Sequence, residues 1–374
     1  MTRLTDLYRI ENFIDTFALG HYARVLSAQD KVSGGTVAFK VLRTEHLAPN
    51  DDPTWEARAF GNEADLLTKL HGISQVIRLL DCGYLDSESE APASGEIVSF
   101  GKDAAGFNRE LRTYSEKGWR PYLVLEYVPR SRSLFYLMRP DKQGVRLRLP
   151  TEEGLALAVQ FADLLRLAHK QNIVYLDHKL EHVYWDGAAL TVIDWNSSRL
   201  LNGSDKENEQ VFRQDVHNLC VGILYSIFTG MSPQKTALRP QPGSQSEVEQ
   251  RYKEITALDF GLEPALSKAL QELLQEGAAM KLDTADDLAY GLREVAIKHG
   301  WDFPGAYTVP ADRDVRSQVQ AALARVRKGE TQLREARDLF MDAAIVDGIS
   351  DDLAAELRRI AKRLGDMLNH RVIP

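Results

Sequence analysis

The stretch Ile173–Asn196 reads I-V-Y-L-D-H-K-L-E-H-V-Y-W-D-G-A-A-L-T-V-I-D-W-N. Two acidic residues in it, Asp177 and Asp194, each follow an apolar run of strand character, and one hairpin's length of chain separates them. Lys179 lies two places after the first acid. The pattern predicts two short hairpins that present two carboxylates and a cation at their ends.

The composition limits what such a site can belong to. With 374 residues, of which 44% are hydrophobic and 27% charged, the chain can bury a sizeable core. Its net charge of -8 argues against a nucleic-acid-binding surface. The cysteines, Cys82 and Cys220, are too far apart for a zinc or disulfide framework.

No segment of the sequence has the features of a membrane or export signal. The N-terminus lacks a basic start followed by a continuous apolar run. The longest strongly apolar run, Leu219–Met231, is shorter than the ~20 residues that a transmembrane helix needs. We therefore expect a cytoplasmic protein whose apolar run is a buried helix.

The first part of the chain alternates like a sheet, and one helix interrupts it. Apolar residues recur at helical spacing from Phe60 to Leu70, with Glu63 beside that face. A polar stretch over 86–120 predicts a mobile insertion with one short hairpin. The expected strands are 17–19, 24–28, 36–42, 76–80 and 122–127.

From Thr151 onward the pattern is mainly helical. The buried helix around 219–228 is expected to stop at Gly230. Beyond residue 304 the composition changes, and three further amphipathic stretches follow, at 315–326, 333–343 and 353–364. These predict a helical tail.

Two further motifs precede these hairpins along the chain. Ala18–Val25 reads A-L-G-H-Y-A-R-V, a glycine-loop pattern of which only Gly20 keeps its glycine, and V-A-F-K follows at Val37–Lys40. With the hairpins around Asp177 and Asp194, these motifs resemble the protein-kinase family, of the Ser/Thr type. The resemblance covers roughly residues 8–300.

The resemblance implies an α+β, two-lobed fold. A small antiparallel β lobe with one helix would occupy 1–127, including the insertion at 86–120. A larger, mainly α lobe would occupy 128–303, and the C-terminal helical extension 304–374. We expect the helices of that extension to pack on the large lobe, to self-associate or to bind a partner.

The resemblance also implies roles for single residues. Asp177 would orient the acceptor hydroxyl, Lys179 would contact the transferred phosphate, and Asp194 would hold Mg²⁺. Asp215 would brace the catalytic loop. Leu125 would lie behind the adenine. The nucleotide-binding residues would be Gly20, Val25, Ala38, Lys40, Glu63, Glu126 and Val128.

Several positions depart from the family pattern. His182 stands where the family has the metal-binding Asn, and imidazole suits softer ions better than Mg²⁺. Trp195-Asn196 replaces Phe-Gly, and Leu176 replaces the Arg that grips an activation-loop phosphate. Only 20 residues separate Asp194 from Asp215, without the A-P-E motif. Recognition of a peptide acceptor must therefore come from elsewhere in the chain.

Three hypotheses for function follow. The first is an ATP-dependent Ser/Thr-type kinase that uses Mg²⁺, with Mn²⁺ as an alternative ion. The second is a pseudokinase that holds a nucleotide or none and acts as a scaffold through its C-terminal helices. The third is a transferase that phosphorylates a small molecule. The sequence leaves the acceptor, protein or small molecule, open.

Overall fold

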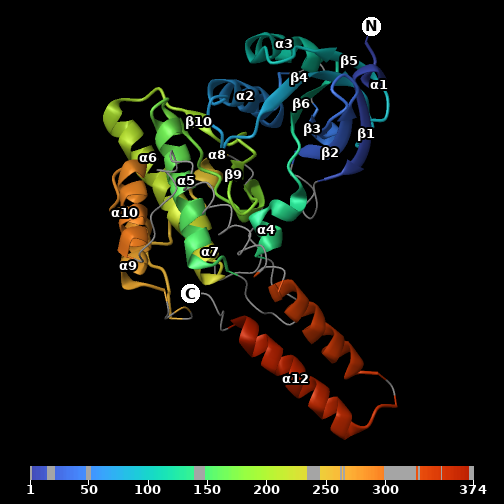
Figure 1. Cartoon of the computed structure of the whole chain (residues 1–374). Helices are drawn as coiled ribbons and strands as arrows, with labels where there is room; N and C mark the ends of the chain where they lie inside the picture. The colour runs from blue at the N-terminus through green and yellow to red at the C-terminus, as the bar shows by residue number, and fades with distance from the viewer. Residues whose placement is uncertain are drawn as a thin grey trace, which may run out of the picture.

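The computed structural model shows a curled antiparallel sheet with its helices above a mainly helical lobe, and a helical hairpin that projects below (Figure 1). Residues far apart in sequence meet where the two lobes face each other. The structure describes residues 2–14, 22–47, 52–138, 148–233, 245–261, 263, 266–298, 326, 329–346 and 348–369.

The sheet of the small lobe has six strands in the order β1-β2-β3-β6-β4-β5. Each neighbouring pair is antiparallel. The turn between β2 and β3 places Gly34 at a left-handed φ of 72°, as Ser33-Gly34-Gly35 predicts. The expected strand at 17–19 lies outside the described residues. The strands are β1 (Tyr8–Phe13), β2 (Ala23–Asp30), β3 (Thr36–Leu42), β4 (Leu79–Asp86), β5 (Glu96–Ser99) and β6 (Arg120–Glu126).

Strand β3 sends alternate side chains to two different cores, because side chains along a strand point to opposite faces. Phe39 lies in the core on the outer face, stacked on Tyr122 with 5.0 Å between ring centroids. Ala38 and Leu42 belong to the core that the small lobe shares with the large lobe. Lys40 lies midway between Ala38 and Leu42 on the same face of the strand, so its side chain points toward the large lobe as well.

Helix α2 (Trp55–Lys69) packs under the sheet and supplies the acidic partner of Lys40. It begins at Thr54, whose hydroxyl accepts a hydrogen bond from the Ala57 amide at 3.2 Å. Glu63 was expected beside the apolar face, but it is fully buried within that face. A fully buried carboxylate needs a partner, which the site described below provides.

The stretch 86–120 is more regular than the mobile insertion we expected. It contains β5 and the helix α3 (Ala104–Glu116), which adds to α2 and to the short N-terminal helix α1 (Leu4–Leu7) in the small lobe. Asp103 caps this helix by accepting a hydrogen bond from the Gly106 amide at 2.9 Å. Phe107 and Leu111 bury its inner face beside α2. The expectation of one helix in the small lobe was therefore wrong.

The large lobe is built around α5 (Thr151–His169), one face of which is buried almost end to end. The expected buried helix around 219–228 is the end of a longer helical run that begins at Asp205. Its end is at Gly230, as predicted, with a left-handed φ of 69°. The helices in order are α4 (Leu134–Leu137), α5, α6 (Asp205–Leu219), a π-helical turn (Cys220–Leu224), α7 (Tyr225–Thr229), α8 (Gln245–Glu249), α9 (Lys268–Ala278) and α10 (Ala285–Lys298).

Four short strands form two small sheets in the large lobe. β7 (Ile173–Val174) pairs with β10 (Arg199–Leu200), and β8 (Val183–Trp185) pairs with β9 (Leu190–Val192). The connection between β7 and β8 presents Asp177, and Asp194 follows β9. Since β7 and β10 are not consecutive strands, the two carboxylates flank a single hairpin, β8–β9, instead of the two hairpins that we expected.

Two helices near the C-terminus lie side by side and project from the large lobe (Figure 1). One covers 329–343 and the other is α12 (Asp351–Asn369). Arg358 donates a hydrogen bond to the Ala344 carbonyl at 3.2 Å across the hairpin. These helices match two of the three expected amphipathic stretches, and the third, 315–326, lies almost entirely outside the described residues. In the part of the chain that the structure describes, no helix has both the length and the apolar character to cross a membrane.

Candidate active site

Asp177 lies buried at the centre of the site, with only 3% of its surface exposed. Its Oδ2 pairs with the Lys179 ammonium at 3.0 Å and lies 3.6 Å from His182 Nδ1. Its Oδ1 lies 3.3 Å from an Nη2 atom of Arg251. Burial alone would raise the pKa of Asp177, but its contacts with Lys179, His182 and Arg251 lower it. Asp177 is therefore held as an ionised carboxylate.

A buried carboxylate fixes the backbone before Asp177. Leu176 has a left-handed φ of 65°, which costs roughly 1–2 kcal/mol for a residue of its size. Asp215 accepts hydrogen bonds from the amides of Tyr175 at 2.9 Å and Leu176 at 2.7 Å, and Asn218 donates to the Leu176 carbonyl at 3.0 Å. These bonds hold the strained turn, and Asp215 occupies the bracing position that the sequence suggested.

Lys40 connects the two lobes. Its ammonium lies 2.7 Å from Glu63 Oε2 in α2 and 2.7 Å from Asp194 Oδ1. Although burial opposes it, the two carboxylates raise the pKa of Lys40, so the ammonium stays charged. Glu63 also accepts a hydrogen bond from the Trp195 amide at 3.3 Å. The expected pair of Lys40 and Glu63 is thus formed, and it includes Asp194 as a third member.

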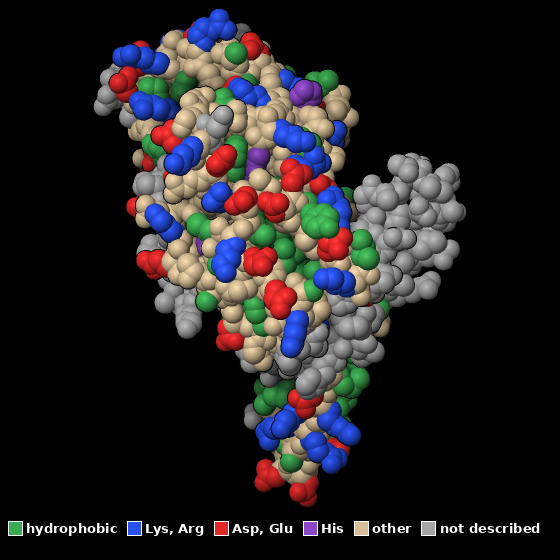
Figure 2. All heavy atoms as spheres, turned by 90° about the vertical axis from the view of Figure 1, so that its left-hand side faces the viewer, with side chains coloured by type: hydrophobic (Ala, Val, Ile, Leu, Met, Phe, Trp, Pro, Cys, Tyr) green, Lys and Arg blue, Asp and Glu red, His purple; other side chains and the backbone are tan. Residues whose placement is uncertain are grey.

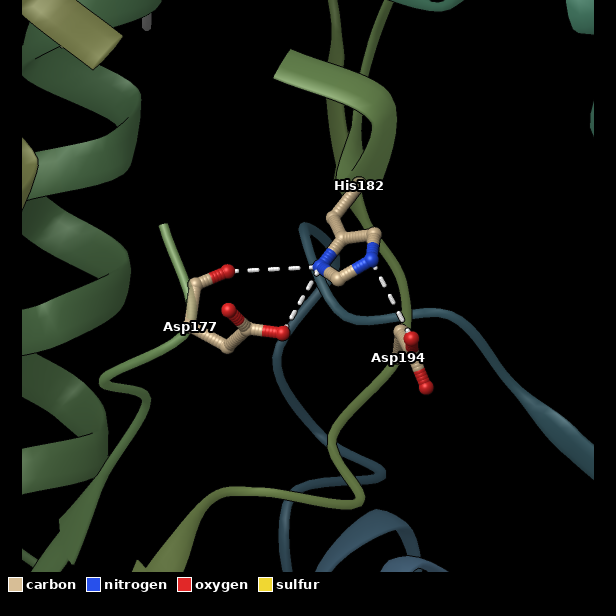
Figure 3. A group of neighbouring side chains, drawn as sticks. All are labelled: Asp177, His182 and Asp194. Carbon is tan, nitrogen blue, oxygen red and sulfur yellow. Dashed lines mark hydrogen bonds and ion pairs between the residues drawn. The ribbon is translucent and has the colours of Figure 1, made fainter. Parts of the chain in front are cut away.

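His182 bridges the two acids of the opening stretch (Figure 3). Its Nε2 lies 3.1 Å from Asp194 Oδ2, and its Nδ1 lies 3.3 Å from the Asp177 carbonyl oxygen. Burial would raise the pKa of Asp194, but Lys40 and His182 hold it well below its ordinary value. One ligand atom from each of Asp177, His182 and Asp194 lies within 4.8 Å of the others. This spacing would suit a single divalent cation.

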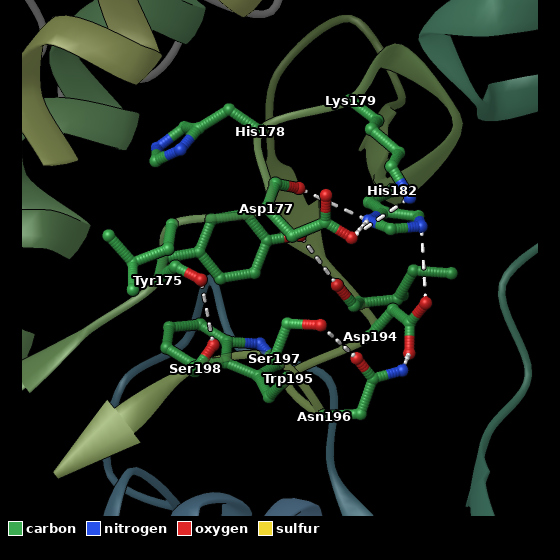
Figure 4. A network of polar contacts seen from close by, with 12 residues as sticks. Tyr175, Asp177, His178, Lys179, His182, Asp194, Trp195, Asn196, Ser197 and Ser198 are labelled. Atoms are coloured by element: carbon green, nitrogen blue, oxygen red, sulfur yellow. Dashed lines mark hydrogen bonds and ion pairs between the residues drawn. The ribbon is translucent and has the colours of Figure 1, made fainter. Parts of the chain in front are cut away.

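The segment after Asp194 contributes an amide that sequence reasoning treated only as a departure. Asn196 donates a hydrogen bond to Asp194 Oδ1, and its own side-chain oxygen accepts from Ser197 at 2.8 Å. Asn62 in α2 donates to the carbonyls of Asn196 at 3.0 Å and Ser198 at 2.8 Å. Figure 4 shows this segment lying beside the catalytic loop. The available signal in the sequence was the position of Asn196, two residues after Asp194, which we expected to bind the metal.

The predicted nucleotide-side residues lie on neighbouring strands. Val25 in β2 is paired with Lys40, and Ala38 is paired with Leu125 in β6. The carboxylate of Glu126 is occupied on the surface by Arg78, at 2.7 and 2.8 Å. Its backbone, not its side chain, would have to contact a base. Val128 is half-buried just beyond β6, and Gly20 lies outside the described residues.

No sequence motif predicted that Arg251 is part of the site. It follows α8 and reaches Asp177 from a segment far along the chain. A single Arg in a polar stretch gives no sequence signal, because only the fold brings it to the acid. The structure thus brings together Lys40, Glu63, Asp177, Lys179, His182 and Asp194 from the sequence expectations, and it adds Asn196 and Arg251.

Comparison with known proteins supports the fold. No protein-family model matches the chain. The kinase PK-1 of Cydia pomonella granulovirus superposes with a TM-score of 0.51 at 16% sequence identity, over 76% of this chain and 93% of that one. Rabbit (Oryctolagus cuniculus) protein kinase C zeta type is 25% identical over 175 residues, which are 47% of this chain but only 22% of that protein. The chain therefore has the protein-kinase-like two-lobed α+β fold.

Proposed function

We propose, from the premise that this chain has the protein-kinase-like fold, that it is an ATP-dependent phosphotransferase of the Ser/Thr type. The observation that carries the proposal is the position of Lys40, at 2.7 Å from both Glu63 and Asp194. A buried ammonium held by two acids costs desolvation energy that a packed apolar residue would avoid. Such an arrangement is expected where the charges serve a reaction.

Each charged residue has a place in the transfer. Asp177 would accept the proton of the acceptor hydroxyl as its oxygen attacks the γ-phosphorus, and the bond to the bridging oxygen breaks to leave ADP. Lys179, whose ammonium is 3.0 Å from Asp177, would contact the transferred phosphoryl group. Lys40 would leave Asp194 and bind the α and β phosphates while Glu63 keeps it in place. Leu125, Glu126 and Val128 would contact the adenine.

Asp194 and His182 are the residues that would hold the metal ion. His182 can donate its Nδ1 proton to the Asp177 carbonyl, which leaves Nε2 free as a ligand beside Asp194 Oδ2. A donor set of one imidazole and carboxylate oxygens fits Mn²⁺ and also admits Mg²⁺. When bound, the ion would neutralise charge on the phosphates.

A second candidate, the pseudokinase, also has an observation in its favour. Both oxygens of Asp177 face cations of the chain, and Lys40 pairs directly with Asp194. A scaffold would need only the fold and a surface for a partner. The C-terminal hairpin offers exposed apolar side chains at Leu339, Ile345, Val346, Leu353 and Met367.

Label transfer from ATP separates the two candidates. Wild-type protein and the variants Asp177→Ala and Asp194→Ala are incubated with labelled ATP and either Mg²⁺ or Mn²⁺. Glu181→Gln, which alters an exposed acid in the same loop, serves as the matched control. Transfer that requires Asp177 and Asp194 but not Glu181 supports the kinase. Clear nucleotide binding without any Asp-dependent transfer supports the pseudokinase.

Binding itself is tested by thermal unfolding. A nucleotide present at about 100 times its dissociation constant should stabilise the protein by roughly 2.7 kcal/mol. The shift should shrink in Lys40→Ala, because the ammonium that would bind the phosphates is gone. If no nucleotide with either metal raises the melting temperature of the wild type, the kinase candidate fails, and only a pseudokinase that binds no nucleotide remains.

A further inference from the structure

The outer oxygen of Asp177 faces a segment of the chain that is not part of the catalytic hairpins. Oδ2 is engaged by Lys179 and His182, so Oδ1 is the oxygen left for an acceptor hydroxyl. Oδ1 is buried and accepts no hydrogen bond from any residue that the structure describes. The Arg251 guanidinium lies 3.3 Å from it, but the contact lacks hydrogen-bond geometry. A hydroxyl that donates to Oδ1 would therefore lie directly beside Arg251.

The segment that carries Arg251 is firmly built into the large lobe. The Tyr252 hydroxyl donates to the His178 carbonyl at 2.7 Å, and the Tyr252 carbonyl lies 3.0 Å from His217 Nε2. Glu249 pairs with Arg199 of β10 at 2.7 Å. These contacts tie the segment both to the catalytic loop and to the short stretch that follows Asp194. Arg251 is thus held in place as a fixed wall of the acceptor site.

We propose that Arg251 selects acceptors that carry an anionic group, a carboxylate or a phosphate, beside the hydroxyl that receives the phosphoryl group. The inference rests on the proposed function and names the acceptor class for that site. A guanidinium presents several N–H donors in one plane and can pair with a carboxylate or phosphate through two parallel bonds. Once it pairs with such a group, it no longer competes with the hydroxyl for Asp177.

The charges around Arg251 agree with this role. Glu249, the nearest acid on its own segment, is neutralised by Arg199. Lys179, a second cation, lies on the other side of Asp177. A neutral acceptor would leave Arg251 on Asp177, where it withdraws charge from the oxygen that must take the proton.

The test compares anionic acceptors with neutral ones. One pair is a Ser peptide flanked by glutamates and the same peptide flanked by glutamines. The other is 3-phosphoglycerate and glycerol, which asks whether the anion comes from a peptide or a small molecule. For an anionic acceptor we expect Arg251→Gln to raise KM at least about tenfold with a smaller change in kcat. Arg251→Lys should recover part of the loss, and Lys253→Gln, which removes a charge from the same turn, should behave as the wild type.

Two results would overturn the inference. If Arg251→Gln accelerates transfer to charged and neutral acceptors alike, Arg251 is a brake and not a recognition residue. If wild type transfers equally well to both members of each pair, the acceptor class is wrong while the kinase proposal stands.

A binding arm keeps the test independent of catalysis. The same four acceptors are titrated calorimetrically into wild type and Arg251→Gln, each saturated with a non-hydrolysable ATP analogue. Anionic acceptors should bind wild type more tightly, and the difference should disappear in the variant. If transfer is absent but this preference remains, the kinase proposal fails and Arg251 keeps its assignment. If the wild type shows no preference in binding, the assignment itself is wrong.

Discussion

Replacing Asp215 by Asn should destabilise the protein more than the same change at Asp81, another buried carboxylate. Asp215 accepts from two backbone amides, Tyr175 and Leu176, and from His169 Nε2 at 2.9 Å. An Asn keeps one oxygen, so its NH₂ group must face one of these N–H donors. Losing one bond to a charged acceptor and weakening two others amounts to about 2–4 kcal/mol.

Asp81 is the matched control because the groups that donate hydrogen bonds to it are hydroxyls, which can rotate. It accepts from the hydroxyls of Tyr8 at 2.8 Å, Tyr122 at 2.9 Å and Ser99 at 2.6 Å. A hydroxyl can rotate and accept from the new NH₂ group, whereas a backbone amide cannot. We therefore expect Asp81→Asn to cost less than about 1 kcal/mol.

Thermal and urea unfolding, followed by fluorescence of the buried Trp185 and Trp195, measure both variants. For a lobe of this size, the cost at Asp215 corresponds to a melting temperature lower by about 4–16 °C. Equal losses in the two variants, or a larger loss for Asp81→Asn, would refute the reasoning from fixed amide donors.

Acid pH offers a second check on Asp215. Burial alone would raise its pKa, but the hydrogen bond from His169 and the nearby His178 hold it below its ordinary value. When the pKa of a carboxylate is lower in the folded protein than in the unfolded chain, where it is about 3.9 for Asp, the ionised group stabilises the folded state at pH values above about 3.9. This stabilisation is lost as the pH falls through the pKa of the folded state. The difference between wild type and Asp215→Asn should therefore narrow below about pH 4.

Three further predictions concern other parts of the site. Glu63→Gln should lower kcat at least about tenfold, measured by label transfer, and the free energy of unfolding by about 1–3 kcal/mol, measured by urea unfolding. An unchanged rate would count against a role for the Lys40–Glu63 pair in the transfer. Gly222→Ala would place a Cβ 2.7 Å from the Tyr252 ring and should cost about 1–3 kcal/mol, whereas Gly329→Ala, with no atom within 4 Å of its Cβ, should not. His182→Asn should increase the thermal shift with Mg²⁺ and an ATP analogue relative to that with Mn²⁺, and an unchanged ratio would exclude His182 as a ligand.

Figure 2 shows the charged side chains on one face of the molecule. Basic and acidic side chains are interspersed over the described part of this face.

Some features that the sequence analysis overlooked had a local signal. Ala104, Phe107 and Leu111 recur at helical spacing in the stretch we expected to be an insertion, and Asp103 caps them. Ser204 and Glu207 form a capping box that marks the start of α6. Both helices are polar overall, and this polar composition, taken as a sign of loop, hid the helical spacing of their few apolar residues.

The sequence by itself determined the fold and the positions of the principal charges. Alternation in β3 fixes the face to which Lys40 points, and two short apolar strands fix where Asp177 and Asp194 emerge, because strand patterns depend on neighbours along the chain. The tertiary structure alone decided that Glu63 is fully buried, that His182 bridges the two acids, and that Arg251 lies on Asp177. These are contacts between segments distant in sequence, and they depend on packing that no local pattern encodes.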